Sequence, residues 1–332
     1  MLFNKVNQLR KENHYNQAIL TLLEAGCDGL YQNYVLRING KLDKVDAFTT
    51  GEGTHSVLST SENILFIHQV DNTGNVEERR LEFPGRLCSL LTVADRKDIR
   101  TAFVGSECGR VWRVSITSQG DTIQTVEEKQ TKKSDNKILS FSTYHNMLAY
   151  SPLGDSSIHL CSLSEKNKTL LERNNYANVA QIQFFAHHRD EYCALGFTDR
   201  EKEVPLLSLY NKKEDFIWGV EEVEGSVKAL KVIQGKDEEP LIMAGTEKSM
   251  LYAVDLKGRV RWKFRMDSAV NCMEVSYRPD TKEPYTFVGV EGGTLYLLDS
   301  LGVVKWKKMF NAAIKDFALV KISEFHYPHI VV

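Results

Sequence analysis

A repeat of 44 residues constrains the fold of this chain more than any other feature of its sequence. Near the C-terminus, the segment EEPLIMAGTEKSMLYAVDLKGRVRWKF is followed by KEPYTFVGVEGGTLYLLDSLGVVKWKK. Equivalent residues stand 44 positions apart: Pro240 and Pro284, Gly245 and Gly289, Tyr252 and Tyr296, Asp255 and Asp299, Gly258 and Gly302, and Trp262 and Trp306. A fixed period of this length indicates one structural unit that occurs several times.

Each repeat has the pattern of four short β-strands. Apolar runs such as VKALKVI and SMLYAVD are separated by turn residues. Two turns place Asp first and Gly fourth, which suits a tight hairpin because the carboxylate accepts backbone N–H bonds and Gly adopts positive φ. Four strands in a period of about 40–50 residues are typical of β-propeller blades. We therefore predict an all-β fold, a seven-bladed β-propeller with a short N-terminal α-helical segment, and six blades remain an alternative.

Degenerate copies of the repeat extend toward the N-terminus. Third strands are expected near residues 66, 112, 160, 208, 252 and 296. A seventh is expected at 30–40, with a fourth strand at 41–48, whereas the last repeat stops two strands into its pattern at Val332. A last blade shared between N- and C-terminal strands would leave no free sheet edge. The alternative is a fragment cut within a blade. The short interval from 34 to 66 also leaves open a blade of three strands.

Residues 1–26 are predicted to form a helical hairpin, and residues 27–332 the propeller. Apolar residues at 3, 6 and 9 and at 18, 19, 22 and 23 follow helical spacing. The string ENHYNQAILTLLEAG resembles the second half of a tetratricopeptide repeat, in which an aromatic residue and an alanine let two helices pack closely. A single such unit cannot bury its apolar face alone. It would dock on the propeller or on another protein, and Tyr15 is a candidate partner-binding residue.

The blades also resemble known propeller families. The string AVDLKGRVRWKF resembles quinoprotein-type blades, and TVADRKDIRTAFVG, KVIQGKDEEPLIMAG and SYRPDTKEPYTFVG are similar to FG-GAP-type blades; the likeness to WD-repeat blades is more distant. The resemblance implies a fold rather than a function. Calcium-binding FG-GAP loops carry several carboxylates, but each loop here contains a lysine or arginine, and the vicinal cysteine pair of quinone dehydrogenases is absent. No metal and no cofactor is therefore expected.

Composition limits the classes of partner. The formal net charge is −2, so no global positive field attracts nucleic acid. No apolar run approaches the roughly 20 residues of a membrane span, and the N-terminus lacks the apolar core of a signal peptide. Six cysteines occur without a CxxC pair, which favours reduced thiols and a cytoplasmic location. Neither nucleic acid nor a membrane is expected as a partner.

No residue pattern predicts a catalytic site. His187 and His188 are adjacent, and in an extended chain neighbouring side chains point to opposite sides, so the pair is not expected to hold one metal ion. No serine lies in a G-x-S-x-G turn. The paired glycines fit strand turns and not phosphate-binding loops, because no helix follows them. The chain is predicted not to be an enzyme.

Basic residues alternate with apolar ones on the last strand of one repeat, which puts four positive charges on one face. The next repeat adds two more. The resulting candidate partner-binding residues are Arg259, Arg261, Lys263, Arg265, Lys305 and Lys307. The plainer interpretation is solubilising charge on an exposed edge strand, and the functional one is a surface for an acidic protein partner. Trp262 and Trp306 are interpreted as packing residues between blades.

These observations predict a non-catalytic β-propeller scaffold that mediates protein–protein interaction, as a regulatory or assembly subunit of a larger complex. Propellers carry variable loops on a rigid ring. The alternative is a ligand-sensing or enzymatic propeller with a site in the central channel. Polar residues on the innermost strands would favour this alternative, but residues 227–233 and 270–276 are mostly apolar at alternate positions. The expected partner is therefore a protein and not a small molecule.

Overall fold

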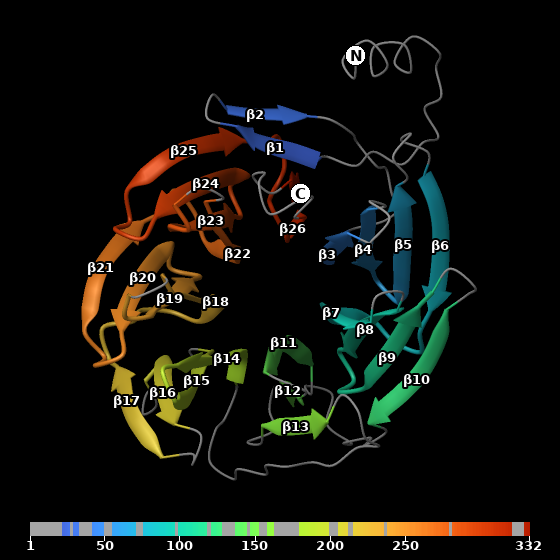
Figure 1. Cartoon of the computed structure of the whole chain (residues 1–332), viewed down its shortest axis with the longest axis horizontal. Coiled ribbons are helices and arrows are strands. Elements are labelled where there is room, and N and C mark those ends of the chain that lie inside the picture. The colour runs from blue at the N-terminus through green and yellow to red at the C-terminus, as the bar shows by residue number, and fades with distance from the viewer. Residues whose placement is uncertain are drawn as a thin grey trace.

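The computed structural model describes residues 22–26, 29–32, 42–49, 55–70, 76–96, 99–117, 121–127, 137–144, 147–152, 158–162, 179–198, 205–211, 215–235, 238–278, 281–320 and 329–332. Every regular element in these ranges is a β-strand. The strands form antiparallel sheets that stand around a central axis, with β3, β7, β11, β14, β18, β22 and β26 innermost (Figure 1). The predicted all-β propeller is therefore confirmed.

Six sheets, here called blades 1 to 6, consist of consecutive strands. Blade 1 contains β3 (Lys44–Thr49), β4 (His55–Ser61), β5 (Ile64–Val70) and β6 (Val76–Glu82); blade 2, β7 (Leu87–Arg96), β8 (Ile99–Ser106), β9 (Val111–Ile116) and β10 (Thr122–Glu127); and blade 3, β11 (Ile138–Tyr144), β12 (Met147–Pro152) and β13 (His159–Ser162). Blade 4 contains β14 (Val179–His187), β15 (Asp190–Phe197), β16 (Leu207–Asn211) and β17 (Phe216–Val220); blade 5, β18 (Val227–Ile233), β19 (Leu241–Thr246), β20 (Met250–Asp255) and β21 (Val260–Arg265); and blade 6, β22 (Val270–Tyr277), β23 (Pro284–Val290), β24 (Thr294–Asp299) and β25 (Val304–Met309).

A further sheet, the terminal blade, combines strands from both ends of the described chain. Its order is β2-β1-β27-β26, where β1 is Leu22–Gly26, β2 is Gly29–Gln32, β26 is Ala318–Val320 and β27 is His329–Val331. The antiparallel contact between β1 and β27 joins the two ends, with Leu23 opposite Ile330. Figure 1 shows this sheet in the same ring as blades 1 to 6.

The six third strands lie where the repeat predicts them. β5, β9, β13, β16, β20 and β24 contain the expected centres at 66, 112, 160, 208, 252 and 296, and each is third in its sheet. The repeat period therefore located six sheets correctly, including those whose sequences have diverged.

The prediction for the N-terminal strands is wrong by one strand. β1 is the third strand of the terminal blade and β2 is its outermost strand, so the third strand lies at Leu22–Gly26 and not at the expected 30–40. Most of residues 41–48 belong to β3, the innermost strand of blade 1. With β1 as the third strand, the sequence separation between the third strands β1 and β5 is close to one repeat. The short interval expected between residues 34 and 66 therefore does not occur.

Part of the expected helical hairpin is also a strand. Leu22–Gly26 forms β1 and pairs with β2 and β27. A short apolar run is compatible with either a helix or a strand, and a distant partner decides here. Residues 1–21, with Tyr15, lie outside the described residues.

The hydrophobic core is divided among the junctions between neighbouring blades. Each of seven buried clusters combines residues of two adjacent sheets of the described structure. Met243 of blade 5 packs with Met273 of blade 6 in one cluster, and Val331 of the terminal blade packs with Val45 of blade 1 in another. The terminal blade is thus packed on both sides like the other blades.

The repeated glycine of the second strands permits close stacking. A Cβ on Gly289 would lie 2.6 Å from Cγ2 of Ile314, in the segment just before β26 of the terminal blade, closer than carbon atoms approach. Gly245 stands in the same relation to Val270 of blade 6. The glycine in the repeat is therefore required by the neighbouring blade.

Tryptophans on outermost strands join one blade to the next. Trp218 Nε1 donates a hydrogen bond to the carbonyl of Leu256 at 2.8 Å, and Trp262 Nε1 donates to Ser300 at 2.9 Å. Both bonds span 38 positions and reach the hairpin turn before the outermost strand of the next blade. The predicted packing role of Trp262 between blades is confirmed.

Arg79 takes the place of the tryptophan between blades 1 and 2. Its Nη1 atom donates to the carbonyl of Thr117 at 3.1 Å, again 38 positions away. The same nitrogen lies 2.8 Å from Oδ1 of Asp121, a side chain that is 4% exposed. An ion pair therefore supports this junction, whereas an indole supports the junctions between blades 4 and 5 and between blades 5 and 6.

Candidate functional sites

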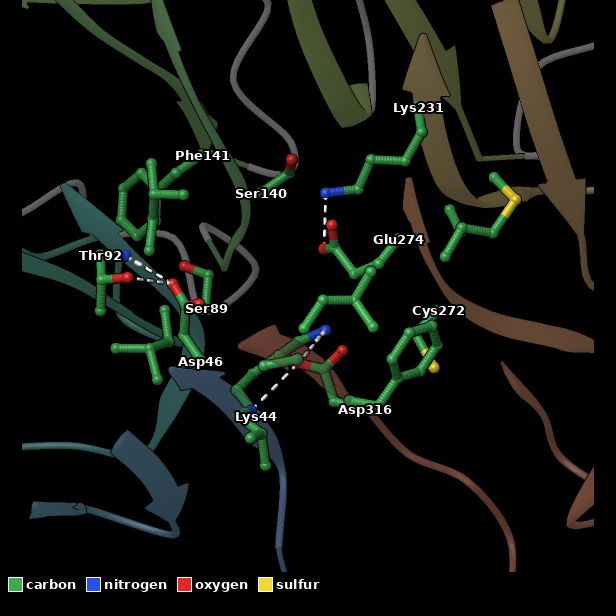
Figure 2. Close-up of a pocket in the computed structure, with 18 of the residues that line it drawn as sticks. Lys44, Asp46, Ser89, Thr92, Ser140, Phe141, Lys231, Cys272, Glu274 and Asp316 are labelled. Carbon is green, nitrogen blue, oxygen red and sulfur yellow. Dashed lines mark hydrogen bonds and ion pairs between the residues drawn. The ribbon is translucent and has the colours of Figure 1, made fainter. Parts of the chain in front are cut away.

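A cavity of about 500 Å³ lies at the centre of the ring. It is lined mainly by the innermost strands β3, β7, β11, β14, β18, β22 and β26, and also by Arg100 of β8. We call it the central channel. Several of its side chains are charged, as Figure 2 shows. Residues 227–233 and 270–276 are mostly apolar at alternate positions, but Lys231 and Glu274 from these two strands line the channel. The main sequence argument against a channel site is therefore wrong.

Lys231 and Glu274 form an ion pair between blades 5 and 6. Nζ of Lys231 lies 2.7 Å from Oε1 of Glu274 (Figure 2). Burial lowers the pKa of Lys231, but attraction and hydrogen bonding to Glu274 outweigh it and the pKa is raised overall. The two residues are 43 positions apart. Lys231 and Glu274 occupy equivalent positions in consecutive repeats, and this spacing of opposite charges is the sequence signal that could have identified the pair.

Asp316 connects the terminal blade to blade 1. Its Oδ2 atom lies 3.7 Å from Nζ of Lys44 and accepts a hydrogen bond from the backbone N–H of Val45 at 3.1 Å. The carboxylate thus supplies a hydrogen-bond acceptor to a backbone N–H group of the innermost strand β3. Ser142 does the same between blades 3 and 4, where its Oγ accepts from the N–H of Phe184 at 3.0 Å.

Asp46 makes the corresponding contact between blades 1 and 2. Its Oδ2 atom accepts hydrogen bonds from the N–H of Thr92 at 2.6 Å and from its hydroxyl at 2.8 Å (Figure 2). Oδ1 accepts from the N–H of Ala47 at 2.8 Å. Burial raises the pKa of Asp46 to about 6, although the hydrogen bonds from Thr92 and Ala47 favour the ionised form. Among the described residues, no cation lies within ion-pair distance of this carboxylate.

The six predicted basic residues lie on the outer strands of blades 5 and 6 or in the turn before them. Arg261, Lys263 and Arg265 on β21 are exposed and alternate with partly buried Val260, Trp262 and Phe264, so the expected single charged face is present. Arg259 precedes this strand and is also exposed; Lys305 and Lys307 are exposed on β25.

The structure divides these six cations into two groups. Arg259 and Arg261 both contact the fully buried carboxylate of Asp255, at 2.8 and 3.0 Å. Lys305 lies 2.7 Å from Asp299. Three of the six cations therefore have a carboxylate partner within their own blade. In the described part of the chain, Lys263, Arg265 and Lys307 pair with no carboxylate.

Asp255 and Asp299 close the predicted hairpins. Oδ1 of Asp255 accepts from the N–H groups of Lys257 and Arg259, and Gly258 has φ 78°. Burial opposes ionisation of Asp255, but the hydrogen bonds from Arg259 and Lys257 outweigh it and lower its pKa. Asp299 repeats the arrangement. The hairpin chemistry predicted from the Asp and Gly spacing is confirmed.

Large apolar side chains are exposed on blade 6, which also carries Lys307. Leu301 is 75% exposed, Val303 52% and Met309 71%. Leu301 and Val303 lie in the turn before β25, and Met309 is its last residue. Lys308, next to Met309, is also exposed. Blade 6 thus presents cationic and apolar groups together.

His187 and His188 differ from the expectation for an extended chain. His188 has φ 56° in the β14–β15 turn, and the two rings are 4.0 Å apart. His187 Nδ1 contacts Nε2 of Gln234 at 3.1 Å. Across the described ranges, no group of three or more His, Cys, Asp or Glu side chains could hold a metal ion. Within the same ranges, no helix has the length and hydrophobicity that a membrane crossing requires.

Comparison with known proteins gives a likeness of fold. No family model and no curated protein matches the chain. A chain of the solved structure titled "Crystal Structure of Mitotic Checkpoint Complex" superposes with a TM-score of 0.64 at 13% identity, covering 96% of this chain and 93% of that one. The likeness shows the fold. The computationally designed protein Ika8 superposes with a TM-score of 0.56 at 13% identity, covering 89% and 96% of the two chains.

Proposed function

We propose that this β-propeller is a non-catalytic scaffold that binds a protein partner, as a regulatory or assembly subunit of a larger complex. The observation that carries the proposal is the outer surface of blades 5 and 6. There, Lys263, Arg265 and Lys307 have no carboxylate partner among the described residues and lie on the same two outer strands as exposed Met309.

The composition of this surface defines the partner's chemistry. Solubilising charge alone would not require exposed Leu301, Val303 and Met309 on the same blade. Exposed apolar groups on the same surface as unpaired cations are suited to a partner segment that carries acidic and apolar side chains, since burial of the apolar groups supplies affinity and the charges supply orientation. The fold likeness to a chain from a protein complex is consistent with this role. Cys88, Cys108 and Cys272 form no disulfide among the described residues, and reduced thiols of this kind support a cytoplasmic location.

Charge reversal tests the proposal directly. The double variant Lys263→Glu, Lys307→Glu is compared with the wild type by affinity purification from the native host and cross-linking mass spectrometry. Lys248→Glu is the matched control, because Lys248 is exposed on the β19–β20 turn. We expect a stoichiometric partner that cross-links to blades 5 and 6, is lost from the double variant and is retained by the control. Equal recovery by both variants, or no stoichiometric partner, would refute the proposal.

A further inference from the structure

The central channel contains two ionic groups of opposite sign without an ionic partner. Among its charged lining residues, Lys231 pairs with Glu274, Lys44 with Asp316, and Lys228 with Glu247 outside the lining at 3.9 Å. Two charged lining residues remain, Asp46 and Arg100. Neither forms an ion pair within the part of the chain that the structure describes.

Arg100 lies near one end of the strand that carries Asp46. Its Nη2 atom donates to the carbonyl of Thr49 at 3.1 Å, and its guanidinium lies over the ring of Phe48, 5.3 Å from the centroid. Asp46 and Phe48 are two residues apart on β3, so their side chains share one face and are separated by about 7 Å along the strand. That face packs toward blade 2, because Phe48 joins the core cluster between blades 1 and 2.

Both groups are held in place and keep free binding capacity. The two Thr92 hydrogen bonds occupy Oδ2 of Asp46, whereas Oδ1 accepts only that from Ala47. A carboxylate oxygen can accept two hydrogen bonds, so Oδ1 has one acceptor position left. A guanidinium has five N–H donors, and the structure shows one bond from Arg100, to Thr49.

We propose that the central channel binds a small zwitterion whose ammonium group pairs with Asp46 and whose carboxylate pairs with Arg100. A cavity of about 500 Å³ is within the range of small-molecule sites, roughly 300–1,000 Å³. Because the other charged lining residues are already paired, a ligand of one sign only would leave either Asp46 or Arg100 without a partner. A partly buried charge gains most from a direct ionic partner. The ligand class is therefore an ω-amino acid or a short peptide, with its charges several ångströms apart.

The test is isothermal titration calorimetry with glycine, 6-aminohexanoate, hexylamine and hexanoate as probes. We expect 6-aminohexanoate to bind about tenfold or more tightly than glycine, which is too short to reach both groups, and than the two singly charged probes. Asp46→Asn and Arg100→Gln should each weaken its binding about tenfold. Lys228→Gln is the matched control, because Lys228 lines the same channel but pairs with Glu247, and it should leave the affinity unchanged.

Three results would overturn the proposal. They are no binding of any probe at millimolar concentration, equal binding of 6-aminohexanoate and hexylamine, and unchanged affinity in both variants. Circular dichroism and thermal unfolding of each variant show whether the ring is intact. If one variant does not fold, the other decides, since Asp46 and Arg100 lie on different strands. None of these results bears on the partner surface of blades 5 and 6.

Discussion

Replacement of Asp255 by asparagine should destabilise the protein strongly. The carboxylate is fully buried, and Oδ2 lies 2.8 Å from Arg259 and 3.0 Å from Arg261. Asparagine can keep the turn bonds at Oδ1, but its amide nitrogen then faces two guanidinium groups. Each hydrogen bond to a charged group is worth about 1.5–3 kcal/mol. Because both arginines are about half exposed, water replaces part of this loss. We expect the free energy of unfolding to fall by about 2–3 kcal/mol.

Asp299→Asn is the internal control one repeat later. Asp299 makes the same turn bonds but contacts a single cation, the exposed Lys305. Its replacement should therefore cost clearly less than that of Asp255. Urea unfolding, followed by tryptophan fluorescence and by circular dichroism, measures both losses and shows whether the two probes agree.

The pH dependence supplies an independent check on Asp255. Its pKa is lowered in the folded state, so its stabilisation is complete above the unfolded pKa of about 3.9 and is lost as the pH falls through the folded value. The stability gap between wild type and Asp255→Asn should therefore narrow below about pH 4. Equal losses at Asp255 and Asp299, or a gap independent of pH, would show that the two arginines do not stabilise the buried carboxylate.

Three further measurements test other contacts. Burial raises the pKa of Asp46 to about 6, so the folded protein binds a proton at this site more tightly than the unfolded chain does. The contribution of Asp46 to the free energy of unfolding should therefore decrease from pH 4 to pH 7, by at most about 3 kcal/mol. Urea unfolding should show the stability of the wild type falling relative to that of Asp46→Asn over this range, and a difference independent of pH would contradict the prediction. Trp218→Phe and Trp262→Phe should each lower the free energy of unfolding by about 1–3 kcal/mol, since each leaves a carbonyl of the next blade unbonded, and a loss at only one site would mean that the two bonds are not equivalent. Gly302→Ala should destabilise by at least about 1 kcal/mol in thermal unfolding, because φ is 80° and the new methyl group would lie 2.8 Å from the Trp262 ring; wild-type stability would exclude that contact.

The repeat predicted much of the ring because each blade uses the same local chemistry. Asp255 and Asp299 form the same turn, and Gly245 and Gly289 meet a β-branched residue of the next blade. Such contacts recur at constant spacing, so a single sequence reveals them. The third strand of each of blades 1 to 6 was located in this way.

Contacts that break the period could not be predicted. β1 owes its place to β27, far away in sequence, and local helical spacing pointed to the wrong structure. Arg79 makes the same contact between blades as Trp218 and Trp262, but an arginine in place of a tryptophan gives no repeat signal in the sequence. The six basic residues lie on or next to the outer strands, as the alternation predicts. The pairing of Arg259 and Arg261 with Asp255 was not predicted, because the turn pattern assigned this carboxylate only to backbone bonds. The charges of the channel could not be predicted, because alternation along one strand does not show which side chains of neighbouring strands meet at the axis.

The contact between β1 and β27 affects the order in which the chain folds. Leu22 and Val331 are paired although they are about 310 positions apart along the chain, whereas every other neighbouring pair of strands within a sheet is joined by a local connection. Bringing such distant segments together costs conformational entropy before any strand pairing can stabilise the chain. We therefore expect the contact between β1 and β27 to form late in folding. We expect a chain in which β1 and β27 are not yet paired to expose two strand edges that can pair with those of another molecule, and formation of the β1–β27 pair removes that opportunity.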